Sequence, residues 1–283
     1  MSFFNFRKKP SKTDGAPEMS AKASAATPAG VSLGYLRQLE LSGHGHLRIV
    51  VARDWALARA HGGTPNREDR KHYRQQGDTL YIGTGIGTNG GYNSVGGSNN
   101  ITSISNSVVG NIVQTAGGTI VTGNGNVQGE KAQPFDFVLY CPRLPHIAAS
   151  GKVAVKADGT GFAEQAVDCR LSGETSFVCH NADAQIVELE ITGNSFVEIR
   201  GSAKALRLEV TGSGEMDLSA CRAETATVDV IGSGRIEVNV SDRLEGSITG
   251  SGTVIHVGEP RHKRIDVCGC GRVRQRNPSR NDQ

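Results

Sequence analysis

Apolar and polar residues alternate on both sides of a glycine that recurs along the second half of the chain. Apolar side chains stand two and four residues before this glycine, as Leu189 and Ile191 do before Gly193. They stand again four and six residues after it, as Val197 and Ile199 do. Alternation with a period of two is typical of β-strands that bury one face. Each copy of the pattern therefore predicts two strands joined by a sharp turn.

The turn glycines recur at a nearly constant interval. In chain order they are Gly151, Gly173, Gly193, Gly212, Gly232, Gly250 and Gly269, with spacings of 22, 20, 19, 20, 18 and 19 residues. A constant period favours a solenoid over a sandwich of hairpins, because each coil must stack on the last with the same side chains inward. A sharp corner also requires positive φ or close backbone approach, which glycine allows. We therefore predict an all-β, single-domain parallel β-helix (β-solenoid) with coils of about 20 residues.

The segment from Leu39 to Ile49 repeats the pattern around Gly43, so it predicts a first coil of the same domain. We assign residues 34–275 to the solenoid and residues 81–130 to an insert rich in Gly, Asn, Ser and Thr. Lys, Arg, Asp, Glu and His are all missing between Thr79 and Gly129. The composition leaves a flexible loop, extra strands or a cross-β segment open for this insert. Residues 1–33 and the basic residues 276–283 are predicted to be disordered tails.

Charge and composition exclude several classes of protein. The formal net charge is +3, which gives no dominant basic field and predicts no specific nucleic-acid binding. No apolar run reaches the roughly 18 residues of a membrane-spanning helix. The N-terminal residues lack the apolar core of a secretory signal, and the six cysteines lack zinc-type spacing. These features predict a reduced, cytoplasmic protein.

The turns carry a resemblance to a known family. The matching elements are Thr211–Gly214, Ile231–Gly234 and Leu244–Gly252 followed by Gly258-Glu259-Pro260. They resemble the bacterial head GIN domain, named for an auto-transporter adhesin and classed as a domain of unknown function. The resemblance covers about residues 34–80 and 131–275. It implies a β-helical domain that is often found on exported proteins.

Four cysteine and three histidine side chains are candidates for metal or redox chemistry. Cys169 and Cys179 occupy inward positions and are predicted to be core residues, with a buried disulfide or metal site as the alternative. A metal-binding or oxidant-sensitive pair is one interpretation of Cys268 and Cys270 beside Gly269, and simple turn positions are the other. The remaining candidates are the histidines His44, His46 and His256. We expect surface or core roles for them and predict no metal, cofactor or catalytic residue.

Charged side chains at outward positions raise the question of an enzyme. Parallel β-helices host carbohydrate-cleaving enzymes that use carboxylates, Lys or Arg on one outer face. Here Asp217, Asp229, Arg235 and Glu237 are predicted to point outward. Outward charges are also what any soluble solenoid requires. The chain is therefore predicted not to be an enzyme.

A Phe/Lys cluster opens the chain. It consists of Phe3, Phe4 and Phe6 followed by Arg7, Lys8 and Lys9. Phe side chains can enter the lipid interface, while the cations are attracted to anionic headgroups. The cluster also looks like the membrane-targeting tail of bactofilins, which are cytoplasmic β-helical scaffold proteins. A disordered tail without membrane contact is the alternative.

Two functional hypotheses follow. The first is a non-enzymatic scaffold that self-associates, end to end or through the insert, at the cytoplasmic face of the inner membrane. The second is an adhesin-like module that binds glycan or protein through an outer face of the solenoid.

Overall fold

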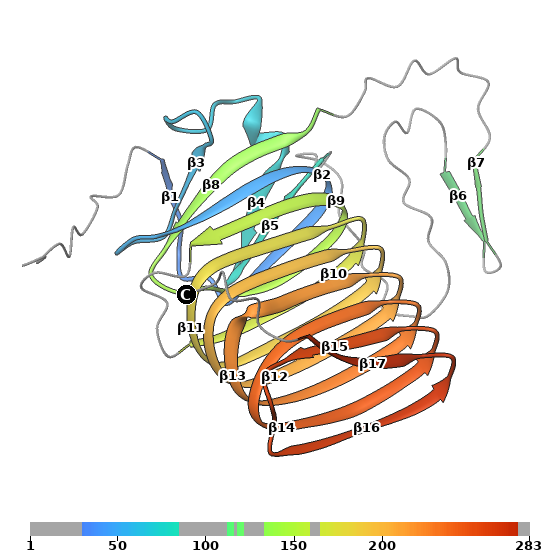
Figure 1. Cartoon of the computed structure of the whole chain (residues 1–283). Coiled ribbons are helices and arrows are strands. Elements are labelled where there is room, and N and C mark those ends of the chain that lie inside the picture. Colours follow the sequence, from blue (N-terminus) through green and yellow to red (C-terminus); the bar gives the residue numbers. More distant parts are fainter. Residues whose placement is uncertain (1–29, 85–111, 116–117, 122–132, 159–164, 277–283) are drawn as a thin grey trace, which may run out of the picture.

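The computed structural model describes residues 30–84, 112–115, 118–121, 133–158 and 165–276. Most of these residues lie in strands that stack as parallel coils, so the predicted all-β solenoid is confirmed (Figure 1). One short 3₁₀ turn, η1 (Asp69–Lys71), interrupts the strands near the N-terminal end.

Long strands form the body of the stack. They are β2 (Gln38–Val51), β9 (His146–Asp158), β10 (Gln165–Gly173), β11 (Ser176–Gly193), β12 (Phe196–Gly212), β13 (Glu215–Gly232) and β14 (Arg235–Gly250). Neighbouring coils pair in parallel with their corner glycines in register, beginning with Gly43 opposite Gly151 and ending with Gly250 opposite Gly269. Residues 38–51 therefore form the coil directly before β9, although the insert separates them in sequence.

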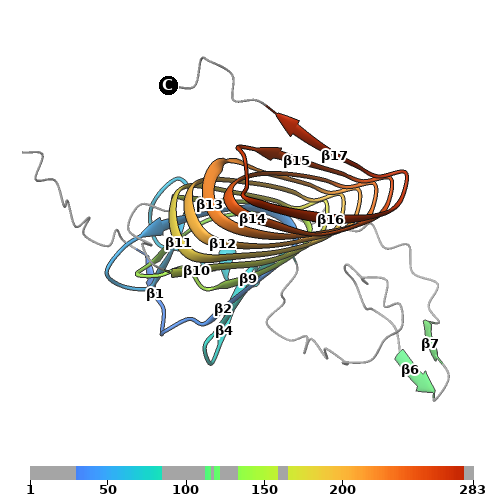
Figure 2. The same ribbon diagram turned by 60° about the horizontal axis from the view of Figure 1, so that its bottom comes forward.

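Each coil has two sides that enclose one core. We call the residues just before each corner glycine the pre-corner side and those just after it the post-corner side. Figure 2 shows the coils as flattened loops stacked along one axis. Inward side chains alternate with outward ones on both sides, as in Leu189 and Ile191 with Glu190 between them. Like residues stack in columns, so Leu189, Leu208 and Val228 lie one above the other.

Backbone geometry explains the Gly-Ser-Gly sequence of the corners. Gly232 has a φ of 115°, and a Cβ there would lie 2.6 Å from the carbonyl oxygen of Gly212. The second glycine has a different reason, since a Cβ on Gly234 would lie 2.4 Å from the Val210 side chain. Side-chain-free positions are thus needed at both ends of the motif.

Two earlier coils fill the second glycine position with a hydroxyl residue instead. Thr175 and Ser195 are almost completely buried, and their side-chain oxygens lie 2.8 Å apart. Ser195 also donates to the carbonyl of Gly173 at 3.2 Å. Mutual hydrogen bonding satisfies the buried hydroxyls, so these coils close without the second glycine.

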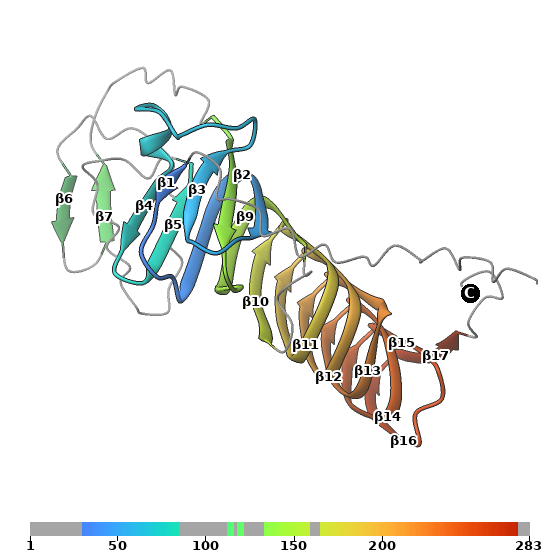
Figure 3. The ribbon, with the colours of Figure 1, turned by 90° about the vertical axis from the view of Figure 1, so that its left-hand side faces the viewer.

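The N-terminal end of the stack is closed by antiparallel strands (Figure 3). On the pre-corner side β2 pairs with β5 (Thr79–Gly83), which pairs antiparallel with β4 (Tyr73–Gln76). On the post-corner side β2 pairs with β8 (Phe135–Cys141), followed by antiparallel β3 (Ala56–Arg59) and β1 (Val31–Ser32).

The C-terminal end is built differently. Its strands are β15 (Thr253–Val257), β16 (His262–Gly269) and β17 (Arg272–Arg276). Within the described ranges β16 pairs with β14 alone and β17 with β15 alone, both in parallel. No antiparallel strand of the described residues covers this end.

Residues 81–83 of the insert belong to β5, and a separate hairpin lies further along it. Strands β6 (Ile112–Thr115) and β7 (Gly118–Val121) form an antiparallel hairpin. Most of residues 81–130 lie outside the described residues, so the alternatives for this segment stay predictions.

Candidate binding groove

A hollow of about 640 Å³ lies on the outer surface of the pre-corner side, close to the closed N-terminal end. Its lining comes from β4, β5, β2, β9, β10 and β11, which form one continuous stretch of sheet. Figure 3 shows β4 and β5 beside β2 and β9. We call this hollow the Tyr81 groove; its residues are Glu40, Leu41, Ser42, Arg74, Gln76, Tyr81, Ala148, Ala149, Ser150, Arg170, Leu171, Ser172, Glu190 and Thr192.

An aromatic ring and a guanidinium form one wall of the groove. Arg74 and Tyr81 are opposite each other in the antiparallel pair of β4 and β5. The guanidinium carbon of Arg74 lies 5.5 Å from the centroid of the Tyr81 ring, which is a cation–π arrangement. The wall thus combines an apolar ring with a cation.

Local hydrogen bonds hold the β4–β5 hairpin in place. Gly77, with φ of 61°, forms the turn, and the Gln75 side-chain amide donates to its carbonyl at 3.0 Å. The side-chain oxygen of Gln75 accepts a hydrogen bond from the backbone N–H of Gly34 at 3.1 Å. Nδ1 of the buried His72 lies 3.1 Å from the Gly83 carbonyl oxygen. These bonds close the hairpin at its turn and its base and tie it to Gly34, while the pairing of β5 with β2 attaches it to the solenoid.

One outward column of the sheet forms the floor. Glu40, Ala148, Arg170 and Glu190 are successive register partners in β2, β9, β10 and β11. Ala148 is the smallest of the four, and it leaves space between the longer side chains of Glu40 and Arg170. Arg170 Nε lies 3.4 Å from Glu190 Oε2. The floor is thus a recess with a carboxylate on one side and an ion pair on the other.

A second column adds hydroxyl groups next to the corner. Its groove members are Ser42, Ser150, Ser172 and Thr192. Ser150 donates to the Leu41 carbonyl at 3.4 Å and Ser172 to the Ala149 carbonyl at 3.5 Å. Because these two hydroxyls donate their hydrogen to a carbonyl of the preceding coil, their oxygen lone pairs stay available to accept a hydrogen bond from a ligand. The groove therefore offers an aromatic face, cations, carboxylates and hydroxyl acceptors on a rigid sheet.

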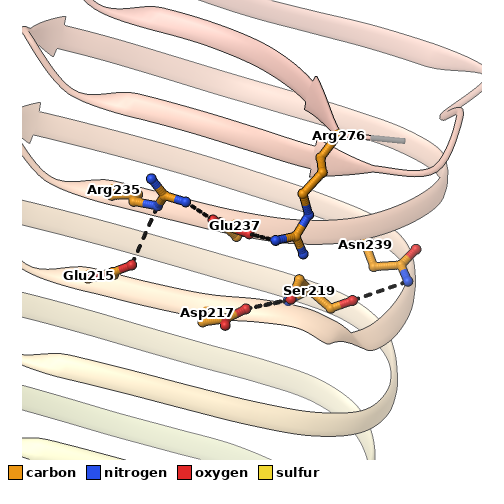
Figure 4. Close-up of polar contacts among 7 residues, drawn as sticks. All are labelled: Glu215, Asp217, Ser219, Arg235, Glu237, Asn239 and Arg276. Atoms are coloured by element: carbon orange, nitrogen blue, oxygen red, sulfur yellow. Dashed lines mark hydrogen bonds and ion pairs between the residues drawn. The ribbon is translucent and has the colours of Figure 1, made fainter. Parts of the chain in front are cut away.

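Three of the four predicted outward charges, Asp217, Arg235 and Glu237, belong to a different cluster near the C-terminal end (Figure 4). Glu237 occupies the outer column next to Asp217 but is only 4% exposed, so it is not the solvated charge that the sequence predicted. Arg235 donates to Glu237 Oε1, and this hydrogen bond raises the pKa of Arg235. Arg276 Nη1 lies 3.0 Å from Glu237 Oε2. Two cations therefore cover this carboxylate.

Neighbouring polar groups of this cluster also have local partners. Asp217 accepts from the backbone N–H of Ser219 at 3.0 Å and from its hydroxyl at 2.7 Å. Asn239 donates to the Ser219 carbonyl at 3.3 Å, and Arg235 forms an ion pair with Glu215 at 3.4 Å. Asp229 lies on the pre-corner side and accepts from Ser247 at 2.6 Å. The Asn239, Arg235 and Ser247 contacts join successive coils, whereas the Asp217–Ser219 bonds lie within β13; both kinds are structural.

The structure separates the cysteines into two groups. Cys141, Cys169, Cys179 and Cys221 are buried free thiols, whereas Cys268 and Cys270 are exposed. Burial raises the pKa of Cys141 and of Cys179 to about 12, that of Cys221 to about 11, and that of Cys169 well above its usual range. Because their pKa values are high, the buried thiols stay protonated and uncharged, which is typical of cysteines in a hydrophobic core.

The candidate histidines do not gather into a site. His44 and His46 are exposed on the first coil. His256 is buried in an inward column, with Nδ1 3.3 Å from the Gly258 carbonyl oxygen and Nε2 3.2 Å from Lys263 Nζ. Within the described part of the chain, no group of three or more His, Cys, Asp or Glu is placed to hold a metal ion.

The N-terminal cluster of Phe3, Phe4, Phe6, Arg7, Lys8 and Lys9 lies outside the described residues, so its membrane contact stays a prediction. Among the described residues no helix is long and apolar enough to cross a membrane.

Sequence reasoning missed the wall of the Tyr81 groove. The available signal was Gly77-Asp78, a two-residue turn between two short stretches that contain Arg74 and Tyr81. Such a pair predicts a hairpin. The Gly77-Asp78 signal does not indicate that the hairpin pairs with β2 at the edge of the sheet, or that its side chains line the same groove as those of β10.

Comparison with known proteins supplies a family and a fold. The model of the family described as "Putative auto-transporter adhesin, head GIN domain" matches residues 94–260, which is more than half of the 283 residues. This match begins inside the insert and ends before β16. The comparison with curated proteins gives no match.

Solved structures share the architecture at low sequence identity. A putative adhesin from Bacteroides fragilis NCTC 9343 is 13% identical with a TM-score of 0.59. A putative lipid binding protein from Parabacteroides distasonis ATCC 8503 is 12% identical with a TM-score of 0.53. A putative adhesin from Parabacteroides merdae ATCC 43184 is 12% identical with a TM-score of 0.50. Each alignment covers 87% of this chain and 94% of the other, and each shows likeness of fold alone.

Proposed function

This chain belongs to the head GIN domain family, and on that premise we propose that it is a non-enzymatic module that binds a glycan through the Tyr81 groove. The observation that carries the proposal is the composition of this hollow. It places the Tyr81 ring beside the Arg74 guanidinium and next to Glu40, with Arg170 and Glu190 further along the same outward column.

The chemistry of the groove matches that of a sugar. A pyranose ring has an apolar C–H face, which packs on an aromatic ring, and hydroxyls that both donate and accept hydrogen bonds. Tyr81 supplies the ring, carboxylates and serine hydroxyls supply acceptors, and guanidinium groups supply donors. The volume of about 640 Å³ also falls in the range of small-ligand sites.

A protein partner fits this surface less well. Specific protein interfaces bury roughly 800 Å² per partner around an apolar core. The Tyr81 groove is instead a hollow of small-ligand size, lined by charged and hydroxyl side chains together with one aromatic ring, that of Tyr81. A glycan is therefore the better-matched class.

The sheet beneath the groove favours binding without rearrangement. Floor residues lie on strands that hydrogen-bond to neighbours on both sides. Because the backbone of the sheet is fixed by these bonds, the site needs no backbone rearrangement to bind a ligand.

The family description also bears on location and activity. A domain described as the head of an auto-transporter adhesin supports an exported location in place of the cytoplasmic one predicted from sequence. Two of the structural neighbours are described as a putative adhesin and a putative lipid binding protein. These descriptions support a binding role for this chain in place of catalysis. The membrane scaffold hypothesis rests on the N-terminal Phe/Lys cluster, outside the described residues.

A glycan array tests this proposal. Fluorescently labelled full-length protein should bind a subset of the arrayed glycans, and Arg170→Gln should weaken that signal at least about fivefold. Arg207→Gln is the matched control, since both arginine side chains are 64% exposed on the pre-corner side and Arg207 lies outside the groove. No binding by the wild type, or equal loss in both variants, would contradict the proposal.

A further inference from the structure

The two ends of the solenoid differ in how they finish. Antiparallel strands close the N-terminal end on both sides. At the C-terminal end β16 and β17 each keep one edge without a strand partner among the described residues. An open edge presents a row of backbone N–H and C=O groups, which is the template for strand addition.

Inward columns of the core continue to this end without cover. Val267 follows Ile248 in register and is 45% exposed, although Ile248 is fully buried. Val273 follows Val254 on the post-corner side and is only partly buried. An added strand with apolar residues at matching positions would bury these side chains as every earlier coil does.

The charge at this end is predominantly positive. Residues 261–276 contain six Lys or Arg residues and one acid, Asp266. Three of the arginines have anionic partners, since Arg261 contacts Asp242, Arg264 contacts Asp266 and Arg276 contacts Glu237.

Arg272 and Arg274 differ from these three. Both are exposed and without an ion-pair partner within the described part of the chain. They stand two residues apart on β17, in the outer columns of Thr253 and Ile255. On a strand this spacing puts both cations on one face, with Val273 facing the core between them.

We propose that the C-terminal end binds an extended acidic segment of another protein by strand addition along β17. Acidic side chains of that segment pair with Arg272 and Arg274, and an alternating apolar side chain packs on Val273. Cross-strand pairs of opposite charge stabilise such an arrangement, and pairs of like charge destabilise it.

Other occupants of this edge match it less well. A second copy bound through the same end would bring the same cations together, which is unfavourable. Residues 277–283 contain one Arg, one Asp and no Val, Ile, Leu or Phe, so their sequence lacks the alternating acidic and apolar pattern. The proposal is independent of the Tyr81 groove, which lies near the opposite end.

Peptide binding to the full-length protein tests this inference. The probe is a fluorescein-labelled eight-residue peptide of alternating Glu and Val, followed by fluorescence anisotropy. We expect saturable binding that weakens with added salt and is lowered at least tenfold by Arg274→Glu. Arg207→Glu, an exposed arginine in the middle of the stack, should leave the affinity within twofold of wild type. Circular dichroism of each variant confirms folding.

Two control peptides separate strand addition from simple charge attraction. A peptide of four Glu followed by four Val has the same composition without the alternation, and a peptide of alternating Lys and Val has the opposite charge. Both should bind at least tenfold more weakly than the alternating Glu/Val peptide. Equal binding of either control, or an unchanged affinity in Arg274→Glu, would overturn the proposal.

Sedimentation velocity of the protein without peptide tests whether a second copy of the chain binds at the C-terminal end. The account predicts a monomer across the concentration range. A concentration-dependent dimer that Arg274→Glu changes would assign this end to a second copy instead and overturn the proposal.

Discussion

Arg276 Nη1 lies 3.0 Å from Oε2 of Glu237, so the last described strand is tied by an ion pair to the strand two places before it in the stack (Figure 4). Glu237 is buried to 4% exposure between this guanidinium and that of Arg235. Because β17 has a strand partner on one side within the described residues, this contact is a second attachment for it.

Removing the Arg276 guanidinium should loosen β17 selectively. Arg276→Gln leaves Glu237 with Arg235 as its cation, so we expect a local loss of about 1–2 kcal/mol. Hydrogen exchange measured by mass spectrometry should show faster exchange for residues 272–276 and unchanged exchange in β11 and β12. Arg274→Gln, which removes an unpaired neighbouring cation, should have little effect. Equal acceleration in both variants would contradict a specific role of the Arg276–Glu237 ion pair in holding β17.

The corner glycines should tolerate a methyl group far less than a loop glycine does. Gly232→Ala places Cβ 2.6 Å from the Gly212 carbonyl oxygen, whereas Gly62, whose φ of 87° is also positive, has nothing within 4 Å of its Cβ position. We expect Gly62→Ala to cost about 1–2 kcal/mol from φ alone and Gly232→Ala at least about twice that. Urea unfolding followed by circular dichroism measures both. Similar midpoints for the two variants would show that the coils can shift to accept the methyl group.

Burial of His256 makes stability depend on pH. Burial and the nearby Lys263 cation lower the pKa of His256, although the hydrogen bond to Gly258 acts in the opposite direction. Below about pH 6.5 the unfolded chain therefore binds a proton that the folded chain resists, so this contribution to stability is lost as pH falls. His256→Gln should reduce the drop in the urea midpoint between pH 7 and pH 5. An identical drop in the variant would mean that other groups cause the dependence.

Thiol reactivity should divide the six cysteines as burial does. Brief treatment of the native protein with iodoacetamide at pH 8 should modify Cys268 and Cys270 and spare Cys141, Cys169, Cys179 and Cys221. Peptide mass spectrometry identifies the modified positions, and the same treatment in urea should label all six. Early native labelling at Cys169 or Cys179 would show that the coils open locally.

The sequence predicted the coils well because each coil must repeat the same inward positions. Alternation around Gly193 and Gly232 is imposed by stacking, so it can be read without coordinates. The strands at the two ends cannot be predicted in this way, because β4, β5 and β17 each pair with a different kind of neighbour and so share no repeated pattern.

The same difference explains the errors and omissions at single residues. Alternation placed Glu237 correctly in an outer column, but it could not show that Arg276 would cover the carboxylate. Most of the insert separates Tyr81 from Arg170 in sequence, and only the parallel pairing of β2 with both β5 and β9 brings them to one groove.

The affinity of a Tyr81→Ala variant for the glycan that gives the strongest array signal tests the central claim most directly. Isothermal titration should show at least a tenfold weaker affinity than wild type, because the aromatic wall is lost. Tyr140→Ala, a partly exposed tyrosine on the post-corner side, should bind as wild type does. Unchanged affinity in Tyr81→Ala would contradict the assignment of glycan binding to this groove.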